Sequence, residues 1–137
     1  MREALIKCYK EVADFFDRFV KENGVTDRIY TKAEIEKMLK DKGIELDTFF
    51  LPSDMFYNHT TRQLGESDYG FKEQIHLFEW LGRNKYRILG SNYAYTGNIY
   101  RTRKIDRKEV IVGKWENGKL VKWDDKMLLD SFYHKTF

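Results

Sequence analysis

The chain has 137 residues and a net charge of +3, a length that suits one domain and leaves little room for a second large core. Hydrophobic residues make up 42% and charged residues 34%, with one proline, which excludes low-complexity and collagen-like chains. The single cysteine, Cys8, excludes disulfide scaffolds and zinc clusters, and no apolar run could cross a bilayer, so we expect a cytoplasmic protein without a membrane partner.

The first predicted element is an amphipathic helix over residues 3–22. Apolar residues recur there at spacings of three and four, which places them on one helical face, while charged residues fall on the other. The apolar face consists of Leu5, Tyr9, Val12, Phe16, Phe19 and Val20. We expect Gly24 to end this helix, because glycine accepts the left-handed conformation of a C-terminal cap.

A second helix is predicted to begin after Thr31. Thr31 can accept a hydrogen bond at the helix start, and Glu34, three residues later, completes a capping box. Gly43 is expected to end the helix. The three residues before Thr31, 28–30, are expected to form a short edge strand.

A third, short helix is predicted over residues 52–61. Pro52 is favoured in the first turn of a helix, and Ser53 and Asp54 suit a helix N-terminus. The polar, glycine-containing stretch that follows, residues 64–72, is expected to be a loop.

Two β-hairpins are predicted in the second half of the chain. Residues 75–81 and 85–89 are rich in β-forming side chains and flank a short turn. Residues 109–115 and 119–123 flank Asn117-Gly118, which is the strongest short turn signal.

In chain order, these elements match the winged helix-turn-helix plan, in which three helices are closed by a β-hairpin wing. The segments Tyr30-Thr-Lys-Ala-Glu-Ile35 and Phe78-Glu-Trp-Leu-Gly-Arg-Asn-Lys-Tyr-Arg-Ile-Leu89 resemble HARE-type winged helices, which accompany restriction, DNA-modification and chromatin proteins. The resemblance covers about residues 28–90. We therefore expect a single α+β domain with a winged-helix core over about residues 1–90, extended by a basic strip and a β-hairpin over 91–137. The resemblance also implies a DNA-associated role.

Positive charge is concentrated in residues 83–108, which contain eight Lys or Arg and one acid. A polyanion approaching the protein would meet this localised field first. The stretch could instead be a solvated loop, balanced by residues 51–82, where acids exceed bases by three.

Candidate nucleic-acid-binding residues lie on the third helix, on the wing and in the strip. Three polar residues of the helix face one way and could read base edges, or could simply end the helix: Asn58, Thr61 and Arg62. Three cations of the wing share one face and could grip phosphate, or could form the solvent face of a sheet: Arg83, Lys85 and Arg87. The strip adds five cations: Arg101, Arg103, Lys104, Arg107 and Lys108.

Tyrosines are interleaved with the cations of the strip. Tyr93, Tyr95 and Tyr100 could stack on bases, as in single-strand binders, or could pack in the core.

The sequence shows no recognisable catalytic site. The histidines at 59, 76 and 134 are scattered and lack metal-ligand spacing, so we predict neither a metal site nor a cofactor. A fragment at 97–100 echoes the GIY-YIG nucleases only faintly, because Asn98 interrupts it.

We therefore predict a non-catalytic DNA-binding module that takes duplex in preference to single strand. The alternative is a protein-interaction module, such as a phage or defence-system accessory, and the third class is a small nuclease. The interaction module would dock a protein partner through exposed aromatic residues: Trp115, Trp123, Phe132, Tyr133 and Phe137.

Overall fold

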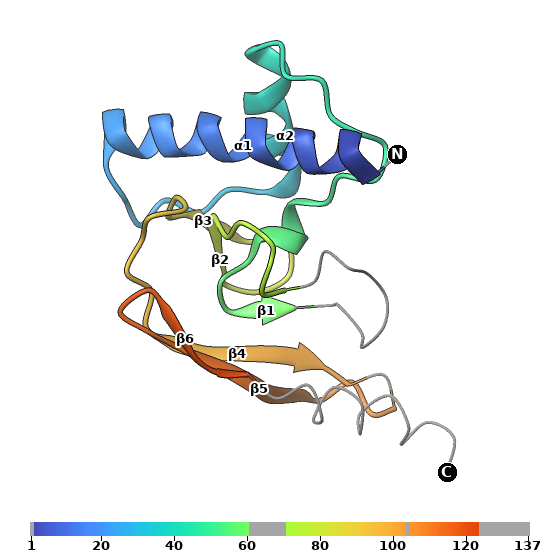
Figure 1. Ribbon diagram of the computed structural model, residues 1–137, viewed down its shortest axis with the longest axis vertical. Coiled ribbons are helices and arrows are strands. Elements are labelled where there is room, and N and C mark those ends of the chain that lie inside the picture. Colours follow the sequence, from blue (N-terminus) through green and yellow to red (C-terminus); the bar gives the residue numbers. More distant parts are fainter. Residues whose placement is uncertain (1, 61–70, 104, 124–137) are drawn as a thin grey trace.

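A computed structural model describes residues 2–60, 71–103 and 105–123. Helices α1 (Arg2–Asn23) and α2 (Lys32–Asp41) form one layer (Figure 1). A four-stranded mixed sheet lies at the opposite end of the molecule, and a two-stranded antiparallel sheet lies between it and the helices. The small sheet contains β2 (Phe78–Trp80) and β3 (Tyr86–Ile88), and the large one has the order β1 (His59–Thr60), β4 (Gly97–Thr102), β5 (Glu109–Glu116), β6 (Lys119–Trp123).

Both long helices form as predicted, because their start and stop signals are local. Gly24 has a φ of 75°, and its N–H donates to the carbonyl of Val20 at 2.7 Å. At the start of α2, the Glu34 N–H donates to the Thr31 hydroxyl at 3.1 Å, and the Glu34 carboxylate accepts from the Thr31 N–H at 2.9 Å. The capping box is therefore confirmed.

The predicted third helix is wrong. Pro52–Met55 form a single 3₁₀ turn, after which the chain becomes extended and enters β1. The reason is non-local: the Leu77 N–H donates to the carbonyl of Met55, and the Tyr57 N–H donates to the carbonyl of Phe78, both at 2.8 Å. This strand pairing satisfies the backbone groups that a helix over 52–61 would otherwise have paired internally.

The winged helix-turn-helix fold is consequently wrong as well. The described residues contain two α-helices, a two-stranded sheet and a mixed four-stranded sheet, rather than three helices and a wing. Both predicted hairpins are confirmed as β2–β3 and β5–β6. The prediction missed β4, which lies in the segment interpreted from sequence as a basic strip.

Residues 56–60 join the two sheets into one strand array. Phe56 pairs with Phe78 in a parallel bridge, and His59 then pairs with Tyr100 in the parallel β1–β4 ladder. This segment therefore runs parallel to both β2 and β4. The β2–β3 turn and the β4–β5 turn follow the C-terminal ends of those strands, so the two turns lie at the same end of the array.

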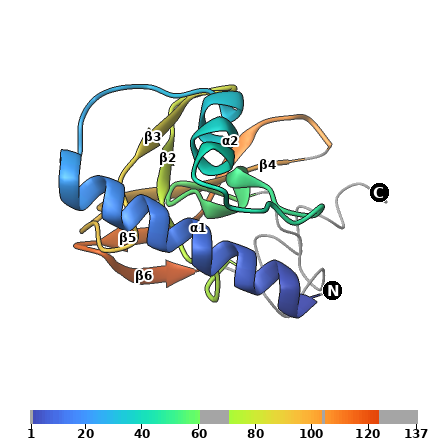
Figure 2. The ribbon, with the colours of Figure 1, turned by 90° about the horizontal axis from the view of Figure 1, so that it is seen from above.

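Two apolar clusters hold the layers together. The first packs α1 and α2 against β2 and β3, with α1 running across the strands when seen from above (Figure 2). The second lies on the inner face of the four-stranded sheet and contains Tyr57, Phe71, Leu89, Tyr95, Ile99, Val112 and Trp115. Trp115 is buried, and its Nε1–H donates to the carbonyl of Tyr57 at 2.7 Å. Within the described part of the chain, neither helix combines the length and apolar character needed to cross a membrane.

Candidate nucleic-acid interface

Four exposed cations project from the two turns at one end of the strand array. Arg83 and Lys85 belong to the β2–β3 turn, and Arg107 and Lys108 belong to the β4–β5 turn. Among the residues that the structure describes, none of these four side chains forms a hydrogen bond or an ion pair. We call these four residues the basic end.

The β2–β3 turn is held in place by its own backbone and by α2. Asn84 adopts a φ of 57°, and the Lys85 N–H donates to the carbonyl of Gly82 at 3.1 Å. The Asn84 side-chain oxygen accepts from the Lys32 N–H at 2.8 Å, which fixes the turn to the start of α2. Arg83 and Lys85 are therefore carried on a short, anchored turn.

The β4–β5 turn is organised by Arg103 and Asp106. The Arg103 guanidinium binds the Asp106 carboxylate, and this contact lowers the pKa of Asp106 to about 2. The Arg107 N–H donates to the carbonyl of Arg103 at 2.9 Å, and Arg107 adopts a φ of 62°. Arg103 thus builds the turn, whereas Arg107 and Lys108 point to solvent.

Three other predicted cations are engaged within the protein. Arg87 lies 3.2 Å from the carboxylate of Glu79 and donates through Nε to the carbonyl of Thr26 at 2.9 Å. Arg101 is 3% exposed and donates to the carbonyl of Thr102 at 3.1 Å. With Arg103 bound to Asp106, these charges are compensated or buried, so the cationic surface is smaller than the sequence suggested.

Asn58 is placed where it cannot read a base edge. Its side-chain Nδ2–H donates to the carbonyl of Trp80 at 2.9 Å, and its Oδ1 accepts from the Trp80 N–H at 2.7 Å. Both ends of the amide are therefore used by β2. The other two predicted readout residues, Thr61 and Arg62, and the strip residue Lys104 lie outside the described residues.

A polar cluster that was not predicted lies between the strand ends that lead into the two turns. The Nε2 of His59 is 3.2 Å from the carboxylate of Glu109 and 3.3 Å from the hydroxyl of Thr102, and that hydroxyl donates to Glu109. Trp80 covers the imidazole at a ring distance of 4.4 Å. Sequence reasoning missed the cluster because it depends on the parallel pairing of β1 with β4.

Burial sets the protonation of this cluster. Desolvation lowers the pKa of His59, and the neighbouring Glu109 opposes that effect. The imidazole is therefore neutral near pH 7, and it links β1 to the base of the β4–β5 turn.

In the part of the chain that the structure describes, the other reactive groups are not assembled into a site. Within the described ranges, His, Cys, Asp and Glu side chains form no group of three that could hold a metal ion. Cys8 is buried, and burial raises the pKa of its thiol, so the thiol stays protonated near neutral pH.

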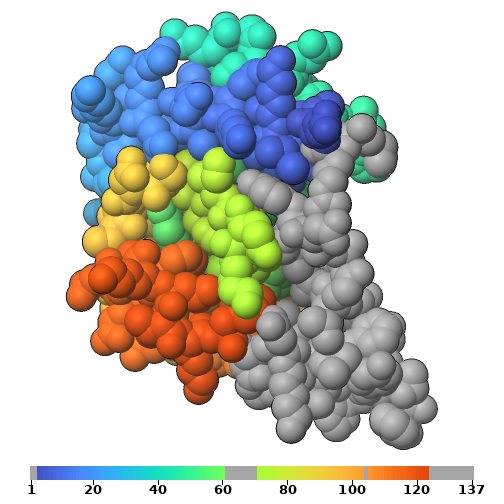
Figure 3. All heavy atoms as spheres, in the orientation of Figure 1, coloured from blue at the N-terminus to red at the C-terminus, as the bar shows by residue number. Residues whose placement is uncertain are grey.

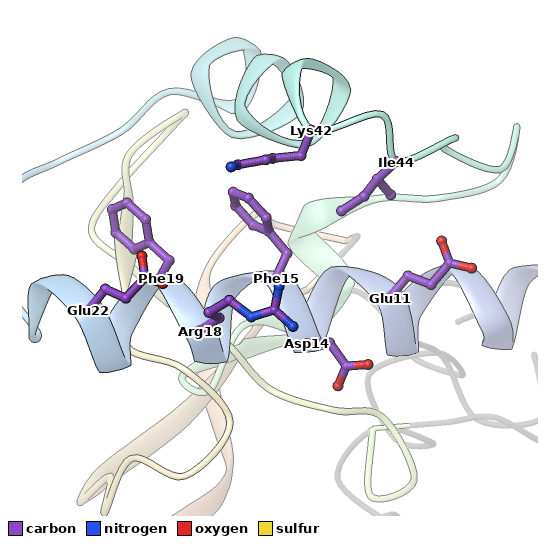
Figure 4. Close-up of a pocket in the computed structure, with 8 residues that line it drawn as sticks. All are labelled: Glu11, Asp14, Phe15, Arg18, Phe19, Glu22, Lys42 and Ile44. Atoms are coloured by element: carbon purple, nitrogen blue, oxygen red, sulfur yellow. The ribbon is translucent and has the colours of Figure 1, made fainter.

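The helix layer carries a separate groove of about 380 Å³ (Figure 4). Phe15, Phe19 and Ile44 supply its apolar surface. Around them are three acids, Glu11, Asp14 and Glu22, and two bases, Arg18 and Lys42. Because acids outnumber bases there, this groove does not suit a polyanion.

The aromatic docking surface of the alternative prediction is largely absent from the described part. Trp115 is 8% exposed, and Trp123 packs on Phe71 with stacked rings 4.9 Å apart. The remaining members, Phe132, Tyr133 and Phe137, lie outside the described residues.

Comparison with known proteins gives a family and one relative. The family model described as "Domain of unknown function (DUF7225)" matches residues 8–122. The chain is similar to "Uncharacterized protein YnaC" of Bacillus subtilis (strain 168), with 35% identity over 111 residues, which cover 80% of this chain and 37% of that protein. The chain therefore spans little more than a third of the relative's length. No solved structure matches the chain.

Proposed function

We propose that this chain, which belongs to the DUF7225 family, binds nucleic acid. In this proposal the basic end holds the phosphate backbone of duplex DNA. One observation carries this proposal. Among the described residues, four exposed cations without an ion-pair partner lie on two turns at the same end of the strand array. A cation already paired with a carboxylate gains little from a phosphate, so these four residues matter more than the total charge does.

The geometry favours binding without sequence readout. Arg83, Lys85, Arg107 and Lys108 are long, flexible or forked donors that suit phosphate oxygens. Asn58, the one described residue that was expected to read a base, is engaged with Trp80. Phosphate contacts fix the position of a protein on DNA but carry no base information.

Salt dependence provides the first test. If all four cations contact phosphate, the logarithm of the binding constant should fall against the logarithm of salt concentration with a slope of about −3.5. Fluorescence anisotropy with a labelled duplex of about 20 base pairs, at about 50 to 200 mM salt, measures this slope. Absence of binding at the lowest salt would refute the proposal.

Substitutions provide the second test. Arg83→Ala with Lys85→Ala, and separately Arg107→Ala with Lys108→Ala, should each weaken binding about tenfold and reduce the slope by about 2. The matched control is Lys10→Ala with Lys40→Ala, which removes two exposed cations from α1 and α2. An equal loss in the control would show that the net charge of the protein, and not the basic end, causes binding.

A further inference from the structure

The outward face of the four-stranded sheet is left open by the helices. Along β4, Ile99 and Arg101 point inward and are buried, so Tyr100 between them points outward. Tyr100 pairs in register with Ile111 of β5, which is 46% exposed. The helices pack on β2 and β3, and β5 and β6 reach the molecular surface (Figure 3). Tyr100 is half-buried, and its register partner on β1, His59, is buried under Trp80.

Two lysines with the same charge stand directly opposite each other on this face. Lys114 of β5 pairs with Lys122 of β6, and both side chains are exposed. Like charges in directly opposed positions destabilise a sheet. An anion bound between the two ammonium groups would remove that repulsion, which makes a phosphate a suitable occupant.

Two acids also lie on this face. Glu109 accepts a hydrogen bond from Thr102 and lies 3.2 Å from His59. Glu116 is opposite Lys119 in the β5–β6 register. Glu109 keeps its negative charge, since Thr102 and the neutral His59 carry no positive charge. The face therefore has two acids and three lysines, which are Lys114, Lys119 and Lys122.

This face is continuous with the basic end. Lys108 directly precedes β5, and Lys114 lies six residues farther along, which corresponds to roughly 20 Å of extended strand. Tyr100 and Ile111 lie between these two cationic positions. Cations at both ends and an aromatic ring between them match the general pattern of single-strand binding surfaces.

We propose that the outward sheet face is a second site, which binds an unpaired stretch of DNA by stacking a base on Tyr100 and holding phosphates at Lys114 and Lys122. Bases in a duplex are stacked on one another and cannot offer a face to Tyr100, so this site selects single strand. The proposal deepens the proposed function and rests on it, because the basic end would hold the adjoining backbone.

The structure separates Tyr100 from the other two tyrosines named as stacking candidates. Tyr95 is buried, with its ring stacked on Tyr57 at 5.2 Å. Tyr93 packs against the same inner cluster. Only Tyr100, of these three, has a place on the outward face.

The test compares single-stranded DNA with duplex, using the full chain and fluorescence anisotropy. Tyr100→Ala should weaken binding of a labelled single strand by about tenfold or more, the loss expected for one base–aromatic stack. Tyr100→Phe keeps the ring and should bind as the unsubstituted protein does. Duplex binding should be unchanged in both variants.

A surface variant guards against a folding defect at Tyr100. Lys114→Ala with Lys122→Ala removes exposed side chains only and should also weaken single-strand binding selectively. Equal losses on single strand and duplex, or no loss on single strand in either variant, would overturn the inference.

The two proposals fail in different ways. Binding of duplex without binding of single strand would overturn the sheet-face site and leave the basic end intact. Binding of single strand that depends on Tyr100, together with no duplex binding, would support the sheet-face site and refute duplex capture by the basic end.

Discussion

His76 should make the protein lose stability in mild acid. The imidazole is 7% exposed and lies among aromatic rings, 4.3 Å from Phe71 and 5.1 Å from Trp115. Its Nε2 has no hydrogen-bond partner within the described part of the structure. Burial lowers the pKa of His76 to about 4, although a backbone hydrogen bond with Phe71 acts in the opposite direction.

The sign follows from the two pKa values. In the unfolded chain the histidine has a pKa of about 6.5, so the unfolded state takes up a proton first as the pH falls. The contribution to stability is complete above that value and is lost progressively down to a pH of about 4. The free energy of unfolding should fall by about 2 kcal/mol between about pH 7 and pH 5 because of this residue.

Urea unfolding followed by tryptophan fluorescence measures the effect at several pH values. His76→Phe keeps an aromatic ring in the cluster and removes the titrating group. Between about pH 7 and pH 5, the free energy of unfolding of this variant should therefore fall by about 2 kcal/mol less than that of the unsubstituted protein. The comparison uses the change with pH, because the variant also loses the hydrogen bond with Phe71 at every pH. An unchanged pH dependence in the variant would refute the reasoning.

Three further substitutions test the fold, each by urea unfolding at neutral pH. Thr31→Ala should lower the free energy of unfolding by about 1 kcal/mol, because it removes the capping hydrogen bond at the start of α2. An unchanged free energy of unfolding would contradict a stabilising role for this cap. Gly113→Ala should lower the free energy of unfolding by about 1 to 3 kcal/mol, since an added Cβ would lie 2.8 Å from the carbonyl oxygen of Lys122. An unchanged free energy of unfolding would mean that β6 can move to make room for the Cβ. Asn58→Ala should cost about 2 kcal/mol by leaving both backbone groups of Trp80 without their partner, and a smaller loss than for Thr31→Ala would contradict that role.

The helices and hairpins could be predicted from sequence because their signals are local. The capping box at Thr31 and Glu34 involves residues three apart, and the Asn117-Gly118 turn brings its own neighbours together. Pro52, by contrast, favours the first turn of a helix but does not decide how far the helix continues. Pairing with β2 ended that helix after one turn.

Part of the ionic structure could have been found in the sequence as well. The predicted β2–β3 hairpin already places Glu79 opposite Arg87, so their ion pair follows from the register. The cluster of His59 with Glu109 is different. It needs the parallel pairing of β1, two residues long, with β4, and no local pattern indicates that pairing.

The side chain of Asn58 has a consequence for binding. Its side-chain amide forms two hydrogen bonds with the backbone of Trp80 in β2. Its backbone carbonyl accepts a hydrogen bond from the Tyr100 N–H of β4 at 3.0 Å. One residue thereby ties the strand before one basic turn to the strand before the other. The separation of the two turns is fixed before any ligand arrives, so little conformational entropy remains to be lost when both turns engage one backbone.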